Sequence, residues 1–275
     1  MADAHRPVTT QFVAIEDPPE IQRVNPIHAE GAKAYGYERP IVAGLSSYGW
    51  ATLAVIELLG DAWLDLGWAE MRFRRPVFAG DALTTTATPT GEATCEFVQV
   101  NAEGKATVEG AAGLGLGPWH AEWRLPARRD PVPAAEHRPF VLPENAPVDE
   151  DYPPMAVDLS VEAARRWAGG RLGDFDPRWH AGEHPRAHPS FVPGQMAPHI
   201  RHSWRFAAGI HVSGRVQHLE PIRAGQTLVV AARWVANEER KARRHSTSHA
   251  VVLAESGQEL AYCAEERILL PPPPR

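Results

Sequence analysis

The stretch VNPIHAEGAKAYGYERPIVAGL, residues 24–45, holds the side chains best suited to acid–base chemistry. The imidazole of His28 titrates near neutral pH, so it can accept or donate a proton under physiological conditions. Asn25 stands three residues earlier, and Gly44 ends a Pro-x-x-x-Gly segment ahead of a long apolar run. A simpler interpretation stays open, in which Asn25 and Pro26 form a turn and His28 is a hydrogen-bonded loop residue.

A second polar set lies in GDFDPRWH, residues 173–180. Asp174 and His180 are candidates for similar acid–base work, although Asp174 could equally be a turn or helix-capping acid. Gly194, in the FVPGQM segment that follows, takes a place like that of Gly44.

A metal site is not expected among the histidines of this region. His184 and His188 have the i, i+4 spacing that presents two imidazoles to one metal ion on a helix. Pro185 and Pro189 lie within or beside the pair and break such a helix. No acidic ligand pattern follows, so the sequence predicts neither a metal nor a redox cofactor.

The elements that must position these residues are a long helix and several antiparallel strands. The run LSSYGWATLAVIELLG after Gly44 predicts a helix that is buried on nearly every side and ends at Gly60. Segments 81–90, 95–112 and 226–270 are rich in β-branched residues and alternate in polarity, with glycine-containing turns. A helix packed on such a sheet is an α+β layer architecture.

The chain contains a weak internal repeat. RRPVFAGDAL, residues 74–83, aligns with LEPIRAGQTL, residues 219–228, so that the prolines, glycines and leucines correspond at a separation of 145 positions. Further correspondences in the same order pair Pro26 with Pro177, Gly44 with Gly194, and Gly104 with Gly257. We predict two copies of one domain, residues 1–125 and 155–275, joined by an ordered, proline-rich linker at 126–154.

Bulk properties exclude several classes of protein. The 275 residues carry a formal net charge of -6 with interspersed signs, so there is no basic stripe for a nucleic acid. The N-terminus lacks the apolar segment of a signal peptide, and no window is apolar enough to span a bilayer. Cys95 and Cys263 are isolated and predict buried thiols in a reducing compartment. We therefore expect a cytoplasmic protein without membrane or nucleic-acid partners.

Together these motifs resemble those of MaoC-like hot dog proteins, the (R)-specific enoyl thioester hydratases and dehydratases. The likeness includes Asn25-Pro26-Ile27-His28, the turn from Pro40 to Gly44, and the repeated Pro-x-x-x-Gly start of a strand. The tandem copies are similar to double hot dog enzymes, in which two repeats form the pseudo-dimer that single-repeat relatives make from two chains. The resemblance implies a tandem hot dog fold, with each antiparallel sheet wrapped around a long central helix.

The resemblance also implies a function and roles for the site residues. The substrate would be an acyl thioester of coenzyme A or acyl carrier protein, interconverted between the 2-enoyl and 3-hydroxyacyl forms. His28 would be the base, Asn25 would position water or the loop, and the amide near Gly44 would stabilise the oxyanion. Asp174 and His180 would form a reserve site.

Two departures from the family pattern keep other functions open. Arg23 stands where the family has an aspartate, and Ala43 stands where it has a histidine before the helix glycine. Arg23 is either a solvated charge or a residue that binds a phosphate or carboxylate of the substrate. Gly194 would be a second substrate-binding residue, in the repeat that shapes the acyl pocket. The alternatives are a non-catalytic acyl-thioester binding protein and a thioesterase that uses Glu30 or Asp174. Association into a homodimer of tandem chains also stays open.

Overall fold

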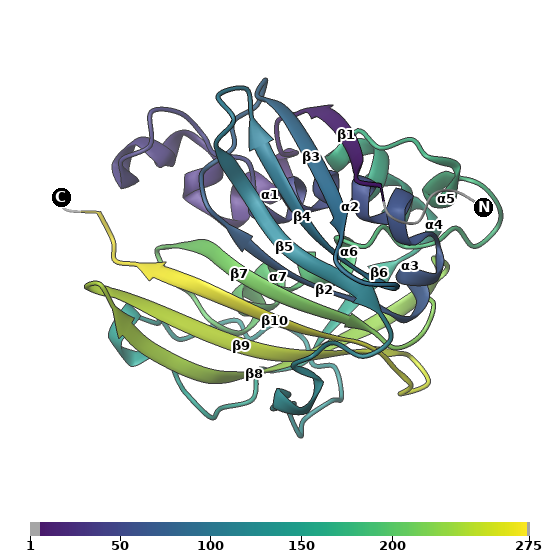
Figure 1. Cartoon of the computed structure of the whole chain (residues 1–275). Coiled ribbons are helices and arrows are strands. Elements are labelled where there is room, and N and C mark those ends of the chain that lie inside the picture. Colours follow the sequence, from purple (N-terminus) through teal and green to yellow (C-terminus); the bar gives the residue numbers. More distant parts are fainter. Residues whose placement is uncertain (1–5, 274–275) are drawn as a thin grey trace.

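In a computed structural model, which describes residues 6–273, one ten-stranded antiparallel sheet forms the body of the protein (Figure 1). The strand order is β1-β3-β4-β5-β2-β7-β10-β9-β8-β6. The strands of the first half are β1 (Val8–Val13), β2 (Gly67–Phe73), β3 (Ala82–Pro89), β4 (Thr94–Asn101) and β5 (Ala106–Leu114). Those of the second half are β6 (Met155–Leu159), β7 (Ala208–His218), β8 (Gln226–Arg240), β9 (Arg243–Ala254) and β10 (Glu259–Leu270).

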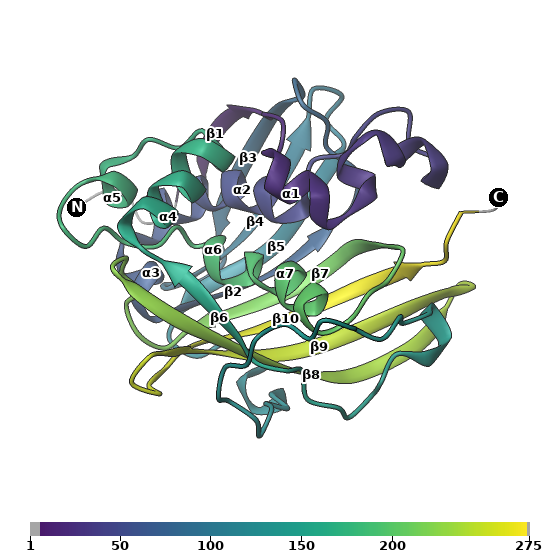
Figure 2. The same ribbon diagram turned by 180° about the vertical axis from the view of Figure 1, so that it is seen from behind.

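The helices lie on one face of this sheet (Figure 2). They are α1 (Pro19–Val24), α2 (Gly44–Leu59), α3 (Ala62–Leu66), α4 (Val161–Arg165), α5 (Pro177–His180), α6 (Phe191–Gly194) and α7 (Met196–Ser203). Short 3₁₀ and π turns complete the chain: η1 (Pro26–His28), η2 (Glu30–Tyr35), η3 (His120–Glu122), η4 (Pro143–Asn145) and the π turn η5 (Arg166–Arg171). None of the helices in the described part of the chain is long and apolar enough to cross a bilayer.

The predicted long helix is confirmed as α2. It begins at Gly44, ends at Leu59, and is followed by Gly60 in a positive-φ conformation that terminates the helix. Nearly all of its side chains up to Ile56 are buried, because the strands of the first half curve around it. Trp50 also donates its indole N–H to the carbonyl of Leu172, which ties the helix to the second half.

Backbone hydrogen bonds show that the two halves are copies of one plan. Gly80 donates to the carbonyl of Ala14 at 2.7 Å, and Gly225 donates to that of Leu159 at 2.8 Å. Both glycines have positive φ and stand one or two residues before a long strand. The 145-residue separation predicted from the sequence is therefore the structural one at these turns.

The correspondence breaks down at the central helix of the second half, which is divided into α6 and α7. Pro193 and Pro198 have no amide hydrogen for the helical ladder, so one regular helix cannot run through this segment. The backbone amide of Ala187 donates to the carbonyl of Ile222, and the amide of Val42 donates to the carbonyl of Val77. These two bonds correspond at a separation of 145 positions, which pairs Gly44 with Pro189. The predicted pairing of Gly44 with Gly194 is therefore wrong by five positions.

The segment between the halves is ordered and contributes no strand to the main sheet. Tyr152 and Asp149 donate backbone N–H groups to the carbonyls of Ala232 and Trp234 along β8. β5 ends at Leu114 and β6 begins at Met155. The domain limits at residues 125 and 155 stay a prediction. Cys95 and Cys263 are buried free thiols, as expected.

Candidate active site

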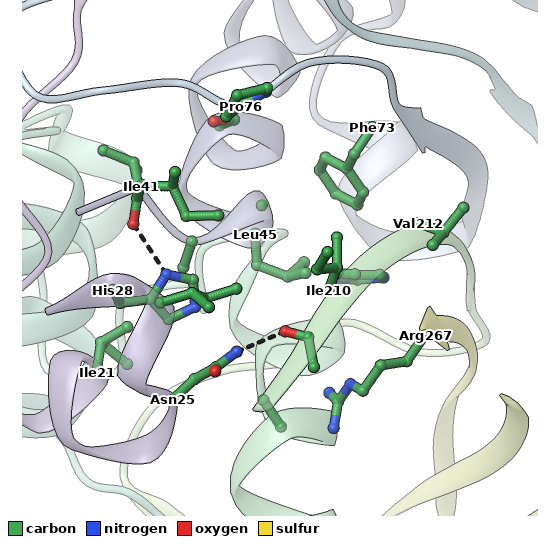
Figure 3. Close-up of a pocket in the computed structure, with 18 of the residues that line it drawn as sticks. Ile21, Asn25, His28, Ile41, Leu45, Phe73, Pro76, Ile210, Val212 and Arg267 are labelled. Atoms are coloured by element: carbon green, nitrogen blue, oxygen red, sulfur yellow. Dashed lines mark hydrogen bonds between the residues drawn. The ribbon is translucent and has the colours of Figure 1, made fainter. Parts of the chain in front are cut away.

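A cavity of about 300 Å³ lies where the two halves meet (Figure 3). One wall is the η1 loop and the start of α2, both from the first half. The opposite wall comes from α7, β7 and β10 of the second half. A cavity of this size is in the range that holds a small ligand.

His28 lies in the wall of this cavity, beside Asn25 (Figure 3). Its Nδ1 donates to the backbone carbonyl of Ile41 at 2.9 Å, which leaves Nε2 as the basic nitrogen. Burial lowers the pKa of His28 below 6.5, and the charges of Arg171 and Arg267 lower it further, against the opposing effect of Asp17. At neutral pH, His28 is therefore an uncharged imidazole that can accept a proton.

Asn25 connects the η1 loop to the second half. Its side-chain amide donates to the carbonyl of Gly209 on β7 at 2.6 Å (Figure 3). Its Oδ1 is buried, and no partner for it lies among residues 6–273. A buried acceptor without a partner beside His28 is the kind of group that a bound water molecule or hydroxyl group satisfies.

Gly44 is the first residue of α2 and lines the same cavity. A β-carbon at this position would lie 3.0 Å from the ring of Phe73, so glycine lets the aromatic ring and the helix approach closely. The amides of Gly44 and Leu45 precede the first intrahelical hydrogen bond of α2. They are placed to donate to negative charge at the helix N-terminus.

Asp17 is a buried carboxylate that the sequence did not reveal. It is only 4% exposed, and it accepts hydrogen bonds from the amide of Ala43 at 2.5 Å and the hydroxyl of Ser46 at 2.7 Å. It therefore anchors the start of α2 from a position 26 residues before Ala43, a separation that no local motif encodes.

Arg171 is the second charged group that sequence reasoning missed. Its side chain is 5% exposed, lines the cavity, and stands 4.0 Å from the carboxylate of Asp17. Nε donates to the hydroxyl of Ser46 at 3.0 Å, and the guanidinium lies 4.1 Å from the ring of Trp167. Asp17, Ser46 and Arg171 thus form one buried polar network behind the start of α2.

The second half contributes a further polar group to the cavity. Arg267 and Glu265 on β10 form a buried ion pair, with Nε 3.0 Å from Oε1. His211 on β7 lies 3.8 Å from Glu265, and burial lowers its pKa. Among the cavity-lining residues, Glu265 is the one carboxylate, and it is already paired.

Of the two predicted substrate-binding residues, one lines the cavity and the other does not. Gly194 lines the cavity, although it occupies the place of Gly49 rather than that of Gly44. Arg23 is exposed at the end of α1 and does not line the cavity wall. Glu30 is also exposed and outside the wall. Neither charge is placed to reach a ligand in this cavity.

The second half has a counterpart of the cavity, but it is closed. Six of its lining residues correspond at 145 positions to residues of the open cavity: Arg186, Ala187, His188, Pro189, Val192 and Ile222 match Ile41, Val42, Ala43, Gly44, Ser47 and Val77. Its volume is only about 10 Å³. Leu64 and His218 complete its wall, and Arg186 forms an ion pair with Asp65 of the first half.

The predicted reserve site is not assembled as expected. The carboxylate of Asp174 accepts from the indole of Trp179 at 2.7 Å and stands 3.5 Å from His188. His180 instead donates to the backbone carbonyl of Asp174 at 2.8 Å and stacks on Phe175. Neither Asp174 nor His180 lines the open cavity, so the structure does not bring this pair together with His28.

The histidines of the second half do not converge on a metal. His184 donates to the carbonyl of Ala224, and His188 contacts Ser190. In residues 6–273 no three His, Cys, Asp or Glu side chains are grouped as metal ligands.

Residues 23–110 match the sequence model described as MaoC like domain. A proposed MaoC domain protein dehydratase from Chloroflexus aurantiacus J-10-fl has a similar structure, with a TM-score of 0.62 and 16% identity over 98% of this chain and 95% of that chain. A conserved hypothetical protein from Mycobacterium tuberculosis, described as a double hot dog fold, matches with a TM-score of 0.59 and 14% identity over 95% of each chain. The fold is therefore a tandem hot dog, as predicted.

Thioesterases share this fold. A proposed oleoyl thioesterase from Lactobacillus plantarum matches with a TM-score of 0.52 and 12% identity over 98% of each chain. No curated protein matches the sequence. At such low identities, the structural likeness shows the fold and does not identify the reaction.

Proposed function

We propose that the protein interconverts 2-enoyl and 3-hydroxyacyl thioesters of coenzyme A or acyl carrier protein, because residues 23–110 match the MaoC like domain and the fold is a tandem hot dog. The observation that carries this proposal is the neutral His28 in the cavity wall at the N-terminus of α2. A base and an amide donor then face the same space, as addition of water to a conjugated thioester requires.

In the hydration direction, His28 Nε2 takes a proton from water as the water oxygen bonds to C3. The C2–C3 double-bond electrons move toward the thioester oxygen, where the amide of Gly44 stabilises the negative charge. The imidazolium of His28 then returns the proton to C2, so that one residue accounts for both transfers. Such a route needs no separate acid at position 23, where the sequence has arginine.

The test is incubation with a panel of 2-enoyl coenzyme A thioesters, following loss of the enoyl absorbance and release of free thiol together. Hydration removes absorbance without thiol. His28→Gln should lower kcat by about 100- to 10,000-fold, the usual contribution of general acid–base catalysis.

His180→Gln is the matched control, because His180 also donates to a backbone carbonyl but lies outside the cavity. Wild-type kcat in His180→Gln is expected. Full hydration activity in His28→Gln would remove His28 from the mechanism.

Thioester hydrolysis is the second candidate, favoured by the thioesterases of the same fold and by the carboxylate of Asp17 at the start of α2. Both oxygens of Asp17 are already hydrogen-bonded, which makes it a poorer base than His28. Free thiol that appears at the rate of substrate loss would decide for hydrolysis. Tight binding with neither signal would instead identify a non-catalytic thioester-binding protein.

A further inference from the structure

One end of the cavity carries an excess of positive charge, on the buried Arg267 and the partly buried Arg201. Arg201 on α7 and Arg267 on β10 both lie over Phe206, with guanidinium carbons 3.7 and 5.6 Å from the ring centre. Both arginines line the cavity, and Arg267 points into it from the side opposite His28 (Figure 3). Arg138 approaches from behind and donates to the backbone carbonyl of Arg201.

Arg201 has no carboxylate partner in residues 6–273 to balance its charge. Nη1 donates to the carbonyl of Phe206 at 2.8 Å, whereas Nε and Nη2 are buried with no partner in the described chain. Burial, followed by the charges of Arg267 and Arg138, lowers the pKa of Arg201 to about 10. Glu265 is already paired with Arg267, so Nε and Nη2 of Arg201 are donors available to a ligand.

Arg267 is connected to the η1 loop, which carries Asn25 and His28, through Gly209. The side chain of Arg267 packs on Gly209, where a β-carbon would be 2.7 Å from its Cδ. The carbonyl of Gly209 accepts from Asn25, which is three residues before His28. A group bound at Arg201 and Arg267 would therefore belong to a substrate whose reacting carbons reach His28.

We propose that Arg201, together with Arg267, binds a carboxylate on the acyl chain, so that the preferred substrate is the monothioester of a dicarboxylic acid. A planar guanidinium with two free N–H groups matches a carboxylate, and burial strengthens such a charge-assisted pair. This inference rests on the proposed function, since it assigns the acyl group that enters the same cavity.

A phosphate of the thioester carrier is the other source of negative charge. Arg74, Arg75 and Arg243 also line the cavity, but they are exposed on its rim. Phosphates of a carrier that extends into solvent are better matched to these exposed arginines. Arg201 and Arg267, which are less exposed than these rim arginines, are left for the acyl end of the substrate.

The test is calorimetric binding of two unreactive thioethers, S-(3-carboxypropyl)-coenzyme A and S-butyl-coenzyme A, which differ only in a terminal carboxylate. The wild-type protein should bind the carboxylated probe about 10- to 100-fold more tightly, as a charged hydrogen-bonded pair allows. Arg201→Gln should lose that preference and keep its affinity for S-butyl-coenzyme A. Arg201→Lys, which keeps the charge but not the planar donors, should lose part of it.

Arg166→Gln is the control, because Arg166 is an exposed arginine outside the cavity and should leave both affinities unchanged. Equal weakening of both probes by Arg201→Gln, with no effect on pantetheine analogues that lack the nucleotide, would assign Arg201 to a carrier phosphate and overturn the proposal. Equal wild-type affinities for the two probes would also overturn it, while leaving thioester hydration intact. A preference for the carboxylated probe without turnover of any 2-enoyl thioester would support the carboxylate site and count against the proposed reaction.

Discussion

Under the proposed mechanism, the protonation state of His28 sets the pH range in which hydration can proceed. Its folded-state pKa is lowered, chiefly by burial, so the neutral base persists at pH values where an exposed histidine is already charged. As pH falls, activity should be lost only below pH 6.5, the ordinary histidine value. A pH profile of kcat/KM measures this limb, and an acid limb above 6.5 would contradict it.

Asp17 acts on His28 through charge and on α2 through its hydrogen bonds. Asp17→Asn removes a charge that raises the pKa of His28, so the acid limb should move to still lower pH. The NH₂ group of the new asparagine would also face a donor, either the amide of Ala43 or the hydroxyl of Ser46, so one hydrogen bond is lost. This loss should lower the free energy of unfolding by about 1–3 kcal/mol. The two readouts are the pH profile and urea denaturation. An unshifted profile would leave Asp17 with a purely structural role.

At this scale the sequence reveals only part of the site. Asn25, His28 and Gly44 could be found because they share one recognisable spacing, and all three line the cavity. Arg171, Arg201 and Arg267 come from η5, α7 and β10, and folding alone brings them together at the cavity. Arg23 shows the same limit, because closeness in sequence to Asn25 does not place its side chain in the cavity wall.

Among the elements, the turns before β3 and β8 are the most predictable, because each requires a glycine. Gly80 and Gly225 have φ values of 91° and 98° and make equivalent hydrogen bonds. The break between α6 and α7 was harder to predict. Its prolines were visible, but the expectation of a second central helix came from the repeat.

The two glycines provide a matched pair for stability. Gly80→Ala should cost about 1–2 kcal/mol from the positive φ alone, since its β-carbon would meet open space. Gly225→Ala adds a clash, because the new β-carbon would lie 2.5 Å from Nδ1 of His184. Chemical denaturation should therefore show the larger loss for Gly225→Ala. Equal losses would mean that His184 moves aside freely.

For the whole molecule, buried histidines link stability to pH. His199, His218 and His249 have pKa values lowered to about 4, in each case mainly by burial. The unfolded chain binds protons at these sites near pH 6.5, before the folded protein does. Stability is therefore complete above pH 6.5 and should fall toward pH 4, by about 1.4 kcal/mol per pH unit for each histidine.

Denaturation midpoints between pH 7 and pH 4.5 measure this slope. His218→Phe should reduce it by about one proton, because both ring nitrogens of His218 are buried without a partner in the described chain. A slope that is the same in His218→Phe and the wild type would show that His218 is not buried as a neutral residue.

The closed counterpart of the cavity in the second half predicts how many thioester molecules one chain binds. Two equivalent repeats would offer two sites, yet one cavity has about 300 Å³ and its counterpart about 10 Å³. A titration should therefore saturate at one equivalent of thioester per chain, with a single hyperbolic isotherm. The second half then serves as one wall of a single binding site, to which it contributes residues of α7, β7 and β10.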